Sequence, residues 1–114
     1  VANRVVGLVR DRVCVLAADM IDTGGTVTKA ADALMADGAK AVIIAATHAI
    51  LSDPAVERLR DCSAVEVIVT NTLPIPPEKE IDGITVLSIA PLISAAVKEV
   101  FEDGSVTSLF GGRA

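Results

Sequence analysis

The residues best suited to bind a ligand are residues 19–26, which read Asp-Met-Ile-Asp-Thr-Gly-Gly-Thr and follow an apolar run. Two adjacent glycines let an anion approach the backbone, and the N–H groups of Thr23 to Thr26, before a helix, can hold a phosphate. An ionised carboxylate only accepts hydrogen bonds, so Asp19 and Asp22 suit the hydroxyl groups of the same ligand. On spacing alone, the pattern indicates either a phosphate site or a tight turn with acidic helix caps.

Two common phosphate motifs do not fit this segment. The P-loop requires Gly-Lys-Ser/Thr, whereas Gly25 is followed by Thr-Val-Thr-Lys, and the Gly-x-Gly-x-x-Gly spacing of dinucleotide sites does not occur. No Lys or Arg lies between Val13 and Thr28. A ligand with several phosphates would therefore need Mg²⁺ or residues from elsewhere in the chain.

Polar residues also follow two other aliphatic runs, at Thr47-His48 and at Thr70-Asn71-Thr72. Ligands of open α/β sheets bind at the carboxyl ends of the strands, so we expect these residues near residues 19–26. His48 is the only histidine, and no carboxylate or nucleophile adjoins it in the sequence. We therefore expect it to have a structural role at the strand end.

Nothing else in the sequence indicates catalysis or a metal site. Cys14 lies in an expected strand and Cys62 ends an expected helix, without the spacing of a metal or redox pair. The charged residues of that helix are expected to form a solvated face with no functional role: Glu57, Arg58, Arg60 and Asp61.

Aliphatic runs alternate with helical patterns, which predicts an α/β fold with a mainly parallel sheet of four to five strands in a three-layer sandwich. The expected strands are Val5–Val9, Val13–Ala17, Ala41–Ala46, Glu66–Thr70 and Thr85–Ile89. Three helices are expected. The first is Thr26–Asp37, with Gly38 as its C′ residue, and the last is Pro91–Phe101. The second is capped by Ser52 or Asp53, has Pro54 in its first turn and ends near Asp61. Three prolines predict an irregular connection over Leu73–Gly83.

The composition fits one aliphatic domain over residues 1–114. Apolar residues make up 52% of the chain, which has no Trp or Tyr, so the core must be built from Val, Ile, Leu and Ala. The net charge of −5 and the lack of a basic stripe argue against nucleic-acid binding. No apolar run approaches the ~20 residues of a membrane span, and no signal peptide is visible. We expect a cytoplasmic protein and, because the first residue is Val1, part of a longer chain.

An apolar strand followed by Asp-x-x-Asp-Thr-Gly-Gly-Thr resembles the phosphoribosyl-diphosphate (PRPP) motif of type I phosphoribosyltransferase folds. The rest of the chain resembles, in order, the C-terminal part of the ribose-phosphate pyrophosphokinase (PRPP synthetase) family. The segments that carry this resemblance are Val5-Val6-Gly7, residues 19–26, Ala46-Thr47-His48, Val69–Pro74 and Ser105–Phe110.

The resemblance implies an enzyme that transfers the diphosphoryl group of ATP to ribose 5-phosphate with Mg²⁺, forming PRPP in a homo-oligomer. It assigns the 5-phosphate to Asp22, Thr23, Gly24, Gly25 and Thr26, and the ribose hydroxyls to the acidic pair that includes Asp19. It also makes three tail residues candidates for a regulatory phosphate site between subunits: Ser105, Thr107 and Phe110.

Two departures from the family pattern limit these implications. Ala18 stands where the family has a second acidic residue, which predicts weaker and less well oriented substrate. The family's ATP-binding, metal-binding and Lys/Arg loop residues precede the matched region, so we expect no catalytic or metal-binding residue here and no cation near the phosphate turn. We therefore expect binding without turnover. The alternatives are a non-catalytic sugar-phosphate or regulatory module and, less well supported, a PRPP-consuming phosphoribosyltransferase.

Overall fold

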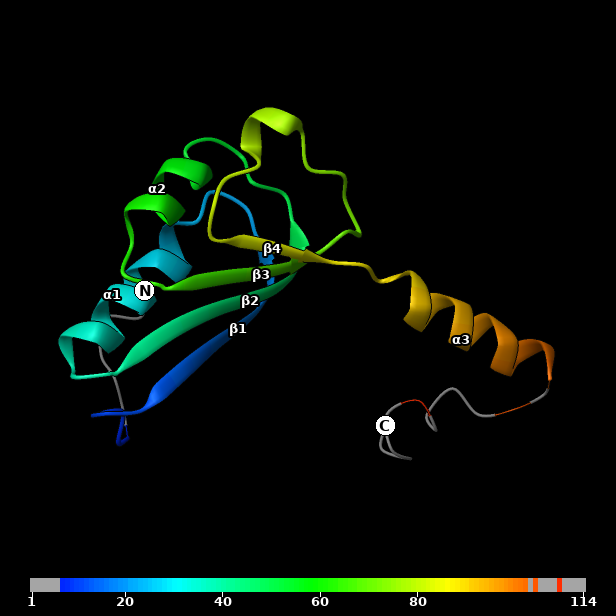
Figure 1. The fold of residues 1–114 in the computed structure, drawn as a ribbon, viewed down its shortest axis with the longest axis horizontal. Helices are drawn as coiled ribbons and strands as arrows, with labels where there is room; N and C mark the ends of the chain where they lie inside the picture. The colour runs from blue at the N-terminus through cyan, green and yellow to red at the C-terminus, as the bar shows by residue number, and fades with distance from the viewer. Residues whose placement is uncertain (1–6, 103, 105–108, 110–114) are drawn as a thin grey trace.

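The computed structural model describes residues 7–102, 104 and 109. Four parallel strands lie in the order β1-β2-β3-β4, and helical segments separate them along the chain (Figure 1). The elements are β1 (Val13–Ile21), α1 (Gly25–Ala36), β2 (Ala41–Ala49), α2 (Ala55–Asp61), β3 (Glu66–Thr70), the 3₁₀ helix η1 (Pro77–Lys79), β4 (Ile84–Leu87) and α3 (Ala90–Phe101). This arrangement confirms the predicted α/β fold with a parallel sheet.

The hydrophobic core lies between one face of the sheet and the helices α1 and α2 (Figure 1). Side chains alternate between the two faces of a strand, so every second residue of β2 and β3 points into this core. The buried members include Val42, Ile44, Val67 and Val69 from the strands, and Ala31, Ala55 and Leu59 from the helices. These contacts hold the first turns of both helices against the carboxyl ends of the strands.

Among the described residues, no helix covers the opposite face of the sheet. Val13 and Val15 of β1 are 56% and 62% exposed on that face, and the register places Val15 beside Ile43. Helix α3 extends away from the sheet (Figure 1) and buries none of its residues. Its exposed apolar side chains are Leu92, Ile93, Val97, Val100 and Phe101. The described chain therefore supplies two of the three expected layers and leaves two apolar surfaces in solvent.

Two strands are longer than predicted. β1 continues past Ala17 to Ile21, and β2 continues past Ala46 to Ala49, because the register pairs Ile21 with Ala49. Both of these terminal residues are buried, at 1% and 2% exposure. Asp19 and the Thr47-His48 pair therefore lie within strands rather than after them, as exposed polar positions near the carboxyl edge.

The strand predicted at Val5–Val9 is wrong in the part that the structure describes. Residues 7–9 are not in a strand, because Gly7 has a φ of +112° and the N–H of Arg12 donates to the carbonyl of Val9 (3.0 Å) in a turn. β4 also ends at Leu87 rather than Ile89, since the N–H of Ile89 leaves the sheet to donate to Asn71 Oδ1 (2.8 Å).

The helix ends match the predictions in part. Gly38 follows α1 with a φ of +99°, and its N–H donates to the carbonyl of Met35 (3.1 Å), as expected of a C′ glycine. The predicted cap of α2 is wrong: no side chain caps this helix, and the N–H of Ala55 instead donates to the backbone carbonyl of Ser52 (2.8 Å). None of the described helices is long and apolar enough to cross a membrane.

The two exposed apolar surfaces predict self-association of the chain. Val15→Lys on the bare sheet face and Val97→Lys on α3 should each weaken it. Loss of one Val side chain that association buries should reduce the free energy of association by about 1.5 kcal/mol, which raises the dissociation constant about tenfold. The measurement is sedimentation velocity over a range of concentrations. Val65→Lys is the control, since Val65 is 61% exposed but lies outside both surfaces. A wild-type chain that is monomeric at all concentrations would contradict the prediction.

Candidate functional site

The turn between β1 and α1 presents backbone donors at a helix N-terminus. Gly24 has a φ of +80° and a ψ of 0°, a left-handed conformation that costs a side-chain-bearing residue about 1–2 kcal/mol. Helix α1 begins at the next residue, and Thr28 is its first N–H to bond within the helix, to the carbonyl of Gly24 (3.1 Å). The buried Thr28 hydroxyl donates to the same carbonyl (2.6 Å). The N–H groups before Thr28 are therefore not used by the helix.

Residues 20–27 line one cavity of about 210 Å³ at this turn. The structure thus brings together all the predicted phosphate-turn residues: Asp22, Thr23, Gly24, Gly25 and Thr26. Asp22, Thr23 and Thr26 are exposed, whereas Gly24 is buried beneath them. The remaining predicted residue, Asp19, does not line this cavity and lies before it in β1.

Asp19 and Ala18 lie on opposite faces of β1. Ala18 is half-buried and packs against the core beneath α1 and α2, and the register pairs it with the buried Ala46. Asp19 is exposed on the other side of the strand. A carboxylate at position 18 would therefore start from the covered face, not beside that of Asp19.

The carboxyl ends of β2 and β3 are joined by side-chain hydrogen bonds. His48 Nδ1 and Thr72 Oγ1 share a hydrogen bond of 2.8 Å, and the Thr70 hydroxyl donates to the carbonyl of Thr47 (2.6 Å). His48 pairs in register with Met20, which lines the phosphate-turn cavity. These contacts place His48 next to the site, where it ties two strands together.

Helix α2 supplies a cation that sequence reasoning missed. Arg58 Nη1 donates to the carbonyl oxygen of Thr23 (3.2 Å), so the expectation that no cation lies near the phosphate turn is wrong. The interpretation of Arg58 as part of a solvated face is incomplete, because its exposed side chain also contacts the turn. No signal in the sequence separates Arg58 from Arg60, since both are arginines on the same helix.

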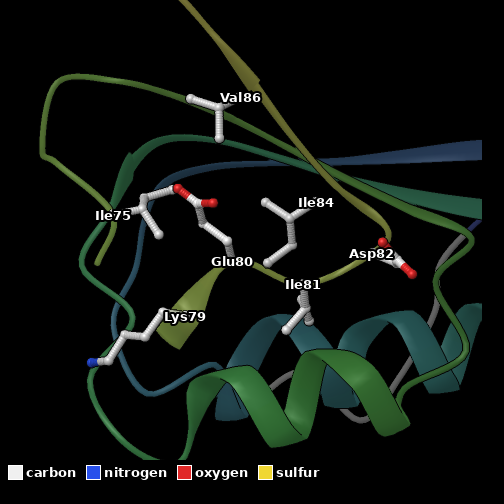
Figure 2. Close-up of a pocket in the computed structure, with 7 residues that line it drawn as sticks. All are labelled: Ile75, Lys79, Glu80, Ile81, Asp82, Ile84 and Val86. Atoms are coloured by element: carbon white, nitrogen blue, oxygen red, sulfur yellow. The ribbon is translucent and has the colours of Figure 1, made fainter. Parts of the chain in front are cut away.

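A larger cavity of about 520 Å³ lies between the proline-rich connection and β4 (Figure 2). Its apolar residues are Ile75, Ile81, Ile84 and Val86, and its charged residues are Lys79, Glu80 and Asp82. Figure 2 shows Lys79 and Asp82 directed to opposite sides, and Lys79 Nζ donates to the carbonyl of Leu51 (2.6 Å). The cavity shares no residue with the phosphate turn, and its charged groups do not converge on a point where a ligand could bind.

The remaining candidates lie apart from the turn. Cys14 and Cys62 are unpaired and half-buried, and each packs against the core. Within the described part of the chain, no three His, Cys, Asp or Glu side chains gather as a metal site. The tail residues proposed for a regulatory site lie outside the described residues: Ser105, Thr107 and Phe110.

Comparison with known proteins identifies close relatives. The family model of the phosphoribosyl synthetase-associated domain matches residues 2–111. A ribose-phosphate pyrophosphokinase of Streptomyces avermitilis is 63% identical over 95% of this chain and 33% of its own length. One of Mycobacterium bovis is 61% identical over 100% of this chain and 35% of its own length.

The fold also matches a solved relative. The crystal structure of phosphoribosylpyrophosphate synthetase from Mycobacterium smegmatis superposes with a TM-score of 0.83 and 59% identity, over 89% of this chain and 34% of that one. The present chain thus spans about a third of the length of the relatives it matches. On these grounds the chain belongs to the phosphoribosyl synthetase-associated domain family, the C-terminal region of ribose-phosphate pyrophosphokinases.

Proposed function

We propose that this chain is the ribose 5-phosphate- and PRPP-binding part of a ribose-phosphate pyrophosphokinase, which makes PRPP from ATP and ribose 5-phosphate. The observation that carries the proposal is the cavity formed by residues 20–27 at the N-terminus of α1. It lies in a chain about 60% identical to pyrophosphokinases over nearly its whole length.

In this proposal the turn binds the 5-phosphate through its backbone. The N–H groups of Gly24, Gly25 and Thr26 donate to phosphate oxygens, and the positive end of the α1 dipole favours the anion. The Thr23 and Thr26 hydroxyls add two donors at the exposed rim. Asp19 lies before the cavity on β1, where its carboxylate accepts hydrogen bonds from ribose hydroxyls.

The full reaction requires groups outside the described site. Diphosphoryl transfer depends on positioning ATP and on cations that stabilise the developing charge. The family reaction uses Mg²⁺, but the described residues do not gather the carboxylates of a complete ion site. ATP and Mg²⁺ are therefore assigned to the part of the synthetase that this chain does not span. On this proposal the chain alone binds substrate but does not turn it over.

Ala18 favours a second candidate function. This residue departs from the acidic pair of the family pattern but leaves the phosphate turn intact. Such a chain suits a non-catalytic sugar-phosphate module, or a regulator that assembles with an intact synthetase. The tail residues Ser105, Thr107 and Phe110 stay candidates for a regulatory phosphate site in either case. The two candidates differ in whether activity appears when the rest of a synthetase is supplied.

Titration of ribose 5-phosphate into the chain should show binding by calorimetry, with no AMP released from ATP and Mg²⁺ in the same preparation. Asp19→Asn should weaken binding about tenfold, because a hydrogen bond from a hydroxyl to a charged acceptor is worth about 1.5–3 kcal/mol. Asp37→Asn, at the far end of α1, is the control. AMP release at the rate of an intact synthetase would contradict the assignment of catalysis to the missing part.

Ala18→Asp tests whether position 18 contributes to sugar binding. Because its side chain starts from the covered face of β1, away from Asp19, the substitution should change the affinity for ribose 5-phosphate by less than about twofold. Position 18 is half-buried against the core, so the substitution should also lower the unfolding free energy by about 1–3 kcal/mol. Calorimetry and urea denaturation measure the two effects. A tenfold gain in affinity for ribose 5-phosphate with no gain for inorganic phosphate would contradict this expectation, because only the sugar has hydroxyl groups.

A matched pair of glycine variants separates backbone strain from ligand binding. Gly24 and Gly83 both have positive φ, +80° and +92°, and an added Cβ would meet only ordinary contacts at Gly24 and open space at Gly83. Alanine at either position should therefore cost about 1–2 kcal/mol of unfolding free energy. Only Gly24→Ala should weaken the binding of ribose 5-phosphate, by about tenfold or more, because a shifted turn misplaces the backbone N–H donors. Equal affinity in both variants would count against the turn as the phosphate site.

A further inference from the structure

We propose that Arg58 is the positioning residue of the phosphate turn. Its hydrogen bond to the Thr23 carbonyl fixes the peptide between Thr23 and Gly24, so that the Gly24 N–H faces the phosphate. This inference rests on the proposed function for the identity of the ligand. The contact between Arg58 and Thr23 does not depend on that identity. Arg58 acts through the turn and does not line the ligand cavity.

The first step of the argument is the geometry of one peptide unit. The carbonyl of Thr23 and the N–H of Gly24 belong to the same planar group, which is trans here, so they point in opposite directions. Arg58 Nη1 holds the carbonyl at 3.2 Å. The Gly24 N–H must therefore point away from Arg58.

The second step is the side of the turn on which Arg58 lies. Arg58 lines a separate hollow of about 380 Å³ between α1 and α2, together with Thr28 and Pro54. The phosphate-turn cavity is lined by residues 20–27 alone and does not include Arg58. The guanidinium thus reaches the turn from outside the ligand cavity.

The third step is the packing of α2 against both glycines. A Cβ on Gly25 would lie 3.0 Å from Arg58 Nη1, a distance at which the guanidinium must move. A Cβ on Gly24 would lie 3.5 Å from Cα of Ala55, which is fully buried. Helix α2 therefore crowds the phosphate turn at Gly25, where the absence of a side chain leaves room for Arg58, and leaves space for a methyl group at Gly24.

Charge adds to the effect of position. No Lys or Arg occurs between Val13 and Thr28, so Arg58 brings a cation to a turn that has none of its own. Its guanidinium is always charged and presents several donors in a fixed plane, whereas a lysine at this position would keep only the charge. Acidic residues line the same hollow, but Asp32 already accepts hydrogen bonds from the Ser63 N–H (2.9 Å) and hydroxyl (2.6 Å).

The test compares Arg58→Gln and Arg58→Lys with Arg60→Gln. Arg60 lies two residues after Arg58 on α2, so its replacement removes an equal charge from the same helix. Ribose 5-phosphate is titrated into each chain. Arg58→Gln should weaken binding about tenfold and Arg58→Lys by a smaller factor, whereas Arg60→Gln should stay within about twofold. If Arg60→Gln loses as much affinity as Arg58→Gln, the loss comes from the change in net charge, and the inference is overturned.

Gly25→Ala provides an independent variant. Its φ is not in the left-handed region, so alanine there does not strain the backbone, but its Cβ crowds Arg58 Nη1 and shifts the guanidinium by a few tenths of an ångström. It should weaken the binding of ribose 5-phosphate in the wild-type background and have much less effect when Arg58 is already Gln, because both changes disturb the same contact. Additive losses would contradict the proposed coupling.

A ligand-free measurement separates this inference from the proposed function. In ¹⁵N–¹H spectra, the amide signals of Gly24 and Gly25 should shift in Arg58→Gln and stay in place in Arg60→Gln. If these amides shift while the wild-type chain binds no ribose 5-phosphate, Arg58 positions the turn and the assigned ligand is wrong. If Arg58→Gln leaves both amides unchanged in a folded chain, the positioning role is wrong whatever the ligand.

Discussion

The packing of α1 and α2 beside each other on one face of the sheet is the constraint on which the rest of the site depends. Gly24 takes a left-handed conformation just before α1, and Arg58 of α2 donates to the carbonyl of Thr23 in the same turn (3.2 Å). Because both helices pack on the same face of one parallel sheet, the end of β1, the start of α1 and the first turn of α2 converge there. The backbone donors of the phosphate turn and the guanidinium of Arg58 both take their places from this close approach.

The sequence was sufficient to predict the elements that depend on local pattern. Continuous aliphatic runs gave the four strands, and apolar residues at helical spacing gave α1 and α3 to within one residue at either end. The grouping of residues 22–26 in one turn was also predictable, because glycines between a strand and a helix permit the positive φ that Gly24 takes. The strand ends were less predictable, since Asp19 and His48 extend β1 and β2 while facing solvent.

The role of Arg58 could not be predicted because it depends on a distant contact. Arg58 and Thr23 are 35 residues apart, and only the packing of α2 beside α1 brings them together. On the helix itself, Arg58 is indistinguishable from Arg60, which has the same charge and exposure. The two bare apolar surfaces have a similar origin: the sequence predicts aliphatic strands and an amphipathic α3, but not what packs against them.

The central claim is that ribose 5-phosphate binds at the turn between β1 and α1. Amide chemical-shift mapping of the ¹⁵N-labelled chain during a ribose 5-phosphate titration tests it most directly. The account predicts saturable shifts that are largest at Thr23, Gly24, Gly25 and Thr26, with a smaller change at Asp19. Shifts confined to the Ile75–Val86 region, or unchanged amides at both glycines, would contradict it.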